Sequence, residues 1–237
     1  MHQILCTRAI PETLLHHAAV NGINLMVTEF ISVHPHIASK DMPAIGALAG
    51  QDGAVVVFTS KHAVNAVADF IDRTAPTGVA PSWKVYCLSP VTQHAVAARF
   101  PGAIIEGRGN DATGLADVII RQPVTEVHFF CGNKRRDVLP EALREKGITV
   151  HEWVVYETAL TPSRVAEDYE GIVFFSPSAV ESFFAVNQPG ENTVCFAIGR
   201  TTGAAAGSHL RRPAILSPAQ DAATMIGTVI NYYKDKA

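Results

Sequence analysis

The stretch Phe129-Phe130-Cys131-Gly132-Asn133-Lys134-Arg135-Arg136-Asp137 sets the pattern for the whole chain. The apolar residues 127–131 predict a short β-strand, and Gly132-Asn133 predicts a tight turn, since both residues tolerate positive φ. Leu139 and Leu143 follow at helical spacing, Gly147 is placed to end a helix, and a second apolar run follows it. This order predicts strand, turn, helix and strand, with backbone N–H groups and three cations at a helix N-terminus. Such a turn is suited to an anion.

The composition favours a folded chain with local rather than global anion recognition. Of 237 residues, 48% are hydrophobic and 17% are charged, and the formal net charge is −3. This balance argues against disorder and provides no global field for nucleic acid. The N-terminal residues do not resemble a secretory signal, and no apolar run is long enough to cross a membrane. We therefore expect a cytoplasmic monomer that binds neither nucleic acid nor a membrane.

The four cysteines lie in or at the end of apolar runs, and none forms a C-x-x-C pair. They are Cys6, Cys87, Cys131 and Cys195. This placement favours buried packing over disulfide, metal or thiolate chemistry.

Strand-to-helix units recur along the chain. The matching positions are Cys6 with Cys131, Leu14 with Leu139, residues 60–64 with 176–180, and residues 85–92 with 195–202. Strands that alternate with helices predict parallel, doubly wound α/β sheets. The unit that begins the chain comes last in its middle part, so two similar domains fit best if the first is discontinuous.

The predicted fold is α/β, with two doubly wound parallel-sheet domains of similar fold joined by a two-stranded β-ladder linker. Residues 1–33 and 162–237 would form the first domain, residues 37–153 the second, and residues 30–36 and 154–161 the linker strands. Two domains joined in this way leave a cleft, and ligands of doubly wound sheets bind at the carboxyl ends of the strands.

Five strand-to-helix turns offer hydroxyl or amide groups together with backbone N–H groups, and four of them carry a cation. They are Thr7-Arg8, Thr59-Ser60-Lys61, Gly132-Asn133-Lys134, Ser176-Pro177-Ser178 and Gly199-Arg200-Thr201-Thr202. Together they would suit a ligand with many carboxylates or phosphates. Each turn alone is more simply explained by helix capping, because Ser and Thr are favoured at helix starts.

Familiar catalytic motifs are absent from the sequence. It contains no dinucleotide or P-loop glycine motif, no G-x-S-x-G and no H-E-x-x-H, and no acid–base carboxylate pair is evident. No metal site is therefore expected, and positioning and oxyanion-type donors would carry the chemistry. Tyr156 stands where the second linker strand begins, so its hydroxyl either reaches the cleft or its ring packs the linker.

At these residues the chain resembles the uroporphyrinogen-III synthase family. The resemblance lies in residues 130–143 with Gly147 and Val155-Tyr156-x-Thr158, and in the turns after residues 58, 174 and 197. It extends from about residue 5 to the helix after residue 221. Ser89 stands where the family often has Gly, and Arg200 where it often has Pro.

The resemblance implies a lyase without metal or organic cofactor, acting in tetrapyrrole (haem) biosynthesis. Its substrate would be hydroxymethylbilane, a linear tetrapyrrole with eight carboxylates, which is cyclised with inversion of the last ring and loss of water. Tyr156 matches the family's tyrosine and would assist the leaving hydroxyl. The expected substrate-binding residues are Arg8, Thr59, Ser60, Lys61, Gly132, Asn133, Lys134, Ser176, Pro177, Ser178, Arg200, Thr201 and Thr202. One alternative is a non-catalytic two-domain binding or sensor protein for a polyanionic small molecule. A phosphate-sugar enzyme is another, weakened by the missing acidic pair and metal ligands.

Overall fold

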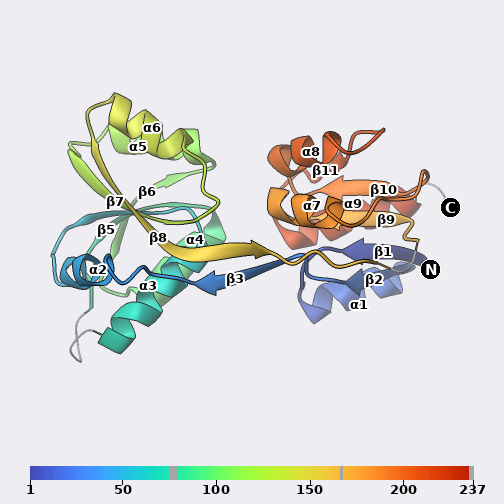
Figure 1. The fold of residues 1–237 in the computed structure, drawn as a ribbon, viewed down its shortest axis with the longest axis horizontal. Helices are drawn as coiled ribbons and strands as arrows, with labels where there is room; N and C mark the ends of the chain where they lie inside the picture. Colours follow the sequence, from blue (N-terminus) through green and yellow to red (C-terminus); the bar gives the residue numbers. More distant parts are fainter. Residues whose placement is uncertain (75–79, 166–167, 235–237) are drawn as a thin grey trace. The chain divides into compact units, whose positions relative to one another are not determined.

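The computed structural model describes residues 1–74, 80–165 and 168–234. The chain divides into two compact units, unit 1 (Met1–Ser32 and Ala159–Ala237) and unit 2 (Val33–Thr158). Each unit is a mainly parallel β-sheet with helices on both faces, and Figure 1 labels most of their elements. Two strands, β3 (Ile31–Pro35) and β8 (Thr149–Leu160), span the boundaries between the units.

Unit 2 is built on a sheet with the strand order β3-β8-β7-β4-β5-β6. Its other strands are β4 (Val55–Phe58), β5 (Lys84–Leu88), β6 (Ile104–Gly109) and β7 (Glu126–Gly132). Its helices are α2 (Met42–Ala49), α3 (Lys61–Thr74), α4 (Pro90–Arg99), α5 (Ala112–Ile120) and α6 (Val138–Glu145). The pairs from β8 through β6 are parallel, which requires the crossover helices that the sequence supplies.

Two apolar cores fill the two faces of the unit 2 sheet. Helices α2, α3 and α4 cover one face, which we call the α3 face, and pack on Val56, Phe58 and Phe130. Helices α5 and α6 cover the opposite face, the α5 face, and pack on Val57 and Phe129. Because neighbouring residues of a strand point to opposite faces, the continuous apolar runs in β4 and β7 supply both cores.

Unit 1 has the strand order β11-β10-β9-β1-β2, again with parallel pairs. Its strands are β1 (His2–Cys6), β2 (Ile23–Val27), β9 (Gly171–Phe174), β10 (Val194–Ala197) and β11 (Ile215–Leu216). Its helices are α1 (Glu12–Val20), α7 (Pro177–Phe184), α8 (Arg200–Gly207) and α9 (Ala222–Lys234). Helices α1 and α9 contribute to the core on one face, and α7 and α8 to the core on the other.

The two sheets have the same arrangement of strands in space, although the corresponding strands occur in a different order along the chain. The series β11-β10-β9-β1-β2 of unit 1 corresponds to β6-β5-β4-β7-β8 of unit 2, and β3 lies outside β8. The predicted pair of similar, doubly wound sheets is confirmed. The predicted use of residues 30–36 and 154–161 as linker strands stays a prediction, although β3 is the neighbour of β8 in the sheet.

The structure corrects local details of the sequence prediction. The apolar residues 23–31 do not form one continuous strand, because β2 ends at Val27 and β3 begins at Ile31. The helix after β7 begins at Val138, so the cations of residues 134–136 lie in the connecting loop and not in the first helical turn. Gly147 does end this helix, with φ of +77° and its N–H bonded to Arg144 O at 2.9 Å.

Candidate functional site

In each sheet there is one pair of adjacent strands from which the chain continues toward opposite edges of the sheet. In unit 2, β4 leads to β5 and β6 on one side, whereas β7 leads to β8 on the other. The carboxyl ends of β4 and β7 are neighbours, with Phe58 opposite Phe130. The turns Thr59-Ser60 and Gly132-Asn133 follow directly, so two of the five predicted turns meet at this point. Such a switch in direction is where doubly wound sheets bind ligands.

Tyr156 of β8 lies against the same point. A Cβ atom added to Gly132 would stand 2.4 Å from Cζ of Tyr156 and 2.8 Å from its hydroxyl oxygen, so only glycine leaves room for the ring. Gly132 does not have the positive φ that the sequence suggested, because it is the last residue of β7. Its role is close approach to the tyrosine, and a glycine can serve either purpose.

The tyrosine side chain is half-buried and held from the α3 side. Its ring centroid lies 5.8 Å from that of His62, and it packs against the core of the α3 face. Burial raises the pKa of Tyr156, and a hydrogen bond with Ser60 partly opposes this rise. The phenol is therefore protonated at neutral pH and able to donate a proton.

Ser60 and its neighbours form the start of α3. Ser60 Oγ accepts the N–H of His62 at 3.1 Å, which is the capping role that serine commonly takes. Thr59 is half-buried, and Lys61 is exposed as the first residue of α3. His62 lies two residues beyond Ser60 at the same helix start and was not among the predicted site residues.

The loop after β7 is bonded closely to β8. The N–H of Asn133 donates to Tyr156 O at 3.2 Å, and Asn133 Oδ1 accepts the N–H of Thr158 at 2.9 Å. The N–H of Arg135 donates to Gly132 O at 3.2 Å. The backbone N–H groups of residues 133 and 135 are thus engaged and not free, contrary to the expectation for this turn. The side chains of Asn133 and Lys134 are exposed.

Glu152 of β8 fixes the charged part of this loop. It pairs with Arg135, and it accepts a hydrogen bond from Arg144 at 2.6 Å. Arg135 also lies 3.0 Å from Asp137. Burial of Glu152 is outweighed by these two guanidinium groups, so its pKa is lowered. Arg135 is therefore paired within the protein and is not available to a substrate anion. The sequence did not reveal this pair, because its two residues are 17 positions apart.

In unit 1 the corresponding point lies between β1 and β9. These strands are parallel neighbours, and Thr7-Arg8 and Ser176-Pro177-Ser178 follow their carboxyl ends. The Arg8 guanidinium lies 4.2 Å from the centroid of the Phe175 ring, in cation–π contact. Desolvation lowers the pKa of Arg8, which remains a cation. Thr7 is buried, and its hydroxyl donates to Val173 O, so it belongs to the fold.

The starts of α7 and α8 differ in how they are capped. Ser176 Oγ accepts the N–H of Ala179 at 3.1 Å, and Pro177 occupies the first helical position. At α8, Gly199 provides no side-chain cap. Within the described residues, the backbone N–H groups of Arg200, Thr201 and Thr202 have no protein acceptor. Thr201 is exposed and Thr202 is buried. Between these two helix starts, that of α8 is therefore the better suited to a carboxylate.

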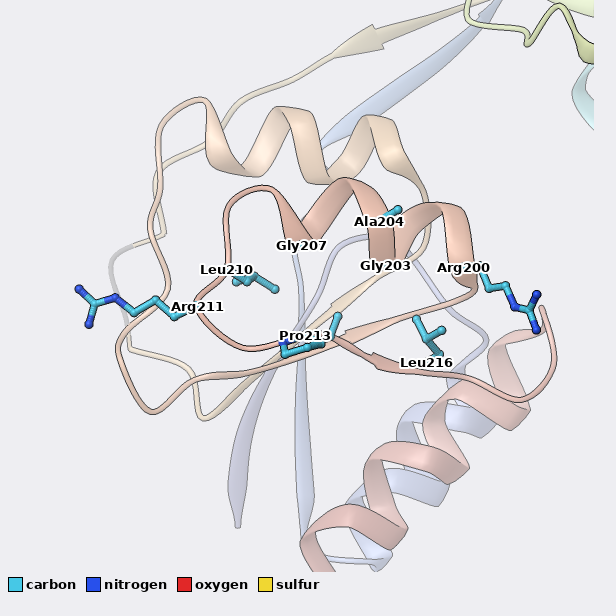
Figure 2. A pocket seen from close by; sticks show the side chains of 9 residues that line it. Arg200, Gly203, Ala204, Gly207, Leu210, Arg211, Pro213 and Leu216 are labelled. Carbon is cyan, nitrogen blue, oxygen red and sulfur yellow. The ribbon is translucent and has the colours of Figure 1, made fainter.

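A pocket of about 350 Å³ lies between α8 and β11 (Figure 2). Small and apolar residues line most of it, and Arg200 and Arg211 extend from its ends. The lining includes no hydroxyl and no charged group besides these arginines. The pocket suits an apolar group.

The residues that the structure describes include no group of three His, Cys, Asp or Glu side chains placed to hold a metal ion. All four cysteines are buried, and burial raises the pKa of Cys6, Cys131 and Cys195 to about 12 and that of Cys87 to about 11. Their thiols are therefore inert at neutral pH, as their placement in apolar runs indicated. Within the same described ranges, no helix is both long and apolar enough to cross a membrane.

Comparison with protein families gives a match that covers most of the chain. The model described as Uroporphyrinogen-III synthase HemD matches residues 15–227, which include four of the five turns and leave out Thr7-Arg8. The chain belongs to the uroporphyrinogen-III synthase family. Its predicted resemblance to this family is confirmed. The matched range includes Tyr156 and the strand-end turns after β4, β7, β9 and β10.

Individual relatives support this membership. A uroporphyrinogen-III synthase of Saccharomyces cerevisiae is 32% identical over 117 residues, which is 44% of this chain and 42% of that protein. The chain thus aligns with less than half the length of this curated relative. Among solved structures, a mutant uroporphyrinogen III synthase of Thermus thermophilus has a TM-score of 0.71 at 14% identity, covering all of both chains. The Helicobacter pylori uroporphyrinogen-III synthetase has a TM-score of 0.67 at 16% identity, covering 98% of this chain and all of that one. At these identities the structures show a shared fold.

Proposed function

We propose that this protein is a uroporphyrinogen-III synthase, a lyase that converts hydroxymethylbilane into uroporphyrinogen III. The observation that carries the proposal is the position of Tyr156, a protonated phenol seated over Gly132 at the switch point of unit 2. Family membership supports the reaction, and the strand-end turns support the substrate class. Eight carboxylates outnumber the groups that any one turn can hold, so several turns with unpaired N–H groups and cations are needed.

The proposed reaction begins with proton transfer from the Tyr156 hydroxyl to the hydroxymethyl oxygen, which leaves as water. The substrate becomes a cationic azafulvene. The substituted carbon of the last ring attacks it and forms a spiro intermediate, which fragments and recloses with that ring reversed. The proton released when the ring regains aromaticity restores the phenol. The enzyme's task is to make this path faster than simple closure.

We assign the substrate carboxylates to three kinds of group. The uncapped start of α8, at Arg200, Thr201 and Thr202, offers backbone N–H groups and a helix dipole. The side chains of Arg8, Lys61 and Lys134 offer cations at strand ends. The remaining strand-end positions, Thr59, Ser60, Asn133, Ser176, Pro177 and Ser178, offer hydroxyl, amide and backbone groups, and Gly132 stands against Tyr156.

An isomer assay tests the function. Hydroxymethylbilane generated in situ is supplied to the protein, the products are oxidised, and type I and type III porphyrins are separated. A shift from type I to type III supports the proposal. Type I alone from a folded sample would instead indicate a protein that binds polyanions without converting them.

The same assay tests the role of Tyr156. The Tyr156→Phe variant keeps the ring over Gly132 and removes only the hydroxyl, so turnover should fall by a factor of about 10²–10⁴ with little change in KM. Unchanged turnover would remove Tyr156 from the mechanism.

We further propose that the protein acts as a monomer in the cytoplasm and without nucleic acid. The modest net charge of −3 supports the absence of a nucleic-acid partner. A mass near 25.4 kDa by light scattering would support the monomer, and twice that mass would contradict it.

A further inference from the structure

Strand β8 is irregular at the point where it carries Tyr156. Along the β7–β8 pair, Cys131 lies opposite Val154, but the next residue, Gly132, lies opposite Tyr156. Val155 is therefore one extra residue in β8, which is a β-bulge. A bulge disrupts the ladder of hydrogen bonds locally, so the residues that follow it need further bonds to fix their position.

The bulge decides the face on which Tyr156 lies. Trp153 packs on the α3 face and Val154 on the α5 face, as alternation requires. Regular alternation would place Val155 on the α3 face and return Tyr156 to the α5 face. Instead, both Val155 and Tyr156 pack on the α3 face. The place of the tyrosine over Gly132 therefore depends on how β8 is held at and beyond the bulge.

Asn133, the first residue after β7, provides two bonds to β8 beyond the bulge. Its N–H donates to Tyr156 O at 3.2 Å, and its side-chain Oδ1 accepts the N–H of Thr158 at 2.9 Å. In a regular parallel ladder, a residue that donates to one carbonyl accepts the N–H two residues further along the partner strand through its own backbone carbonyl. Here the chain turns at residues 133–134, and the side-chain oxygen of Asn133 accepts that N–H instead.

The chemistry of the Thr158 bond fixes the orientation of the Asn133 side chain. A backbone N–H can only donate, so the atom that faces it must be the carboxamide oxygen. The NH₂ group of the same side chain takes no part in this bond. On the other edge of β8, the N–H of His36 donates to Val155 O at 2.9 Å. The β8 backbone is thus bonded on its β3 side at the bulge and by Asn133 beyond it.

We propose that Asn133 is a positioning residue for Tyr156: its N–H and its side-chain oxygen together fix the β8 backbone at residues 156 and 158 and so hold the phenol over Gly132. The proposal rests on the proposed catalytic role of Tyr156. It gives the carboxamide oxygen of Asn133 a task inside the protein and leaves the NH₂ group for a substrate carboxylate.

The kinetic test compares Asn133→Ala, Asn133→Asp and the matched control Asn21→Ala in the full-length protein. Asn21 follows α1, and its side chain donates to His17 O at 2.7 Å, so its loss should leave turnover unchanged. Asn133→Ala removes the bond to Thr158 and should lower kcat about three- to tenfold, as expected for one hydrogen bond, with a smaller change in KM. Asn133→Asp keeps an oxygen that accepts the Thr158 N–H and should restore most of kcat. Its added charge acts on KM, which reports carboxylate binding separately.

Hydrogen exchange measures the bond itself. With ¹⁵N-labelled protein, the Thr158 N–H should exchange about tenfold faster in Asn133→Ala than in the wild type, whereas Asn133→Asp and Asn21→Ala should leave its rate unchanged. If Asn133→Ala folds poorly, Asn133→Ser replaces it. Serine is favoured in turns, and its hydroxyl is one bond too short to take the place of the carboxamide oxygen.

A second background separates positioning from a merely structural role. In Tyr156→Phe the hydroxyl that Asn133 would position is gone, so adding Asn133→Ala should lower kcat no further. A general loss of order in the site would instead lower kcat by the same factor in both backgrounds.

The outcomes are distinct. Unchanged Thr158 exchange or unchanged kcat in Asn133→Ala overturns the role of Asn133 and leaves the proposed function intact. An equal loss of kcat in the Tyr156→Phe background also overturns it. Full turnover of Tyr156→Phe alone overturns the catalytic premise, and the positioning proposal falls with it. Faster exchange and lower kcat in Asn133→Ala, both restored in Asn133→Asp, support the proposal.

Discussion

Replacing Gly132 with alanine tests how tightly the tyrosine is seated. The new Cβ would stand 2.4 Å from Cζ and 2.5 Å from Cε2 of Tyr156, whereas ordinary contact begins at 3.4 Å. The ring must therefore retreat by about 1 Å, since the Gly132 backbone is fixed in β7. Overpacking of this kind costs roughly 1–3 kcal/mol of unfolding free energy. A displacement of about 1 Å at a reacting group can lower turnover about 100-fold.

Two measurements check the expectation for Gly132→Ala. Urea unfolding gives the loss of stability, and the type III isomer assay gives kcat. The control is Gly46→Ala in α2 of the same unit, where an added Cβ meets nothing within 4 Å. This control should keep full turnover and gain about 0.5–1 kcal/mol of stability, because alanine is the better helix former.

A double-mutant cycle identifies the ring as the cause. In a Tyr156→Leu background the aromatic ring is gone, so adding Gly132→Ala should cost clearly less stability than it does in the wild type. The reasoning is refuted if Gly132→Ala alone unfolds at the wild-type urea concentration and keeps wild-type turnover. It is also refuted if the stability loss is the same in both backgrounds.

Two further predictions concern stability. Burial, followed by the nearby His151, lowers the pKa of His128, which accepts a hydrogen bond from Trp153 and also faces Glu126. The unfolded chain therefore binds a proton at residue 128 more readily than the folded one does. The free energy of unfolding should then fall as the pH drops from about 7 to about 5. Urea unfolding of His128→Phe should show a weaker pH dependence than the wild type. In α7, the buried Ser182 Oγ has no hydrogen-bond partner in the part of the chain described. Ser182→Ala should therefore raise the free energy of unfolding by about 1 kcal/mol. A lower urea concentration at the unfolding midpoint would contradict this.

The sequence predicted the architecture well because the architecture depends on local patterns. Buried parallel strands form continuous apolar runs, and the helices between them have their own period and end signals. The recurring units then predicted that the strands of the two sheets follow the chain in a different order. Cys6 and Cys131, which recur in these units, lie in the equivalent strands β1 and β7. The strand-end turns followed from the same reading, because parallel strands bring their carboxyl ends to one edge.

The details of the site depend on pairing between distant residues, which sequence patterns do not record. The bulge at Val155 appears only when β8 is aligned with β7. Gly132 carries no sign of whether it serves a turn or makes room for a ring 24 positions later. Arg135 appeared to be one of three cations available to a ligand, but it forms an ion pair with Glu152. One local signal did indicate a structural detail. Ser89 stands where the family often has glycine, and it is the one non-glycine residue with positive φ in the described ranges.

The permuted order of unit 1 has a consequence for synthesis on the ribosome. Unit 2 is one continuous segment, so all of its strands are available once residue 158 has emerged. In unit 1, Ile4 and Leu5 of β1 are fully buried and pair with β9, which is made only after the whole of unit 2. During that interval β1 can pair with β2 but lacks its other neighbour, β9, and this exposed apolar edge is prone to aggregation. Slow or incomplete folding of unit 2 would lengthen this exposure, so a substitution in unit 2 can reduce the yield of unit 1 without touching it.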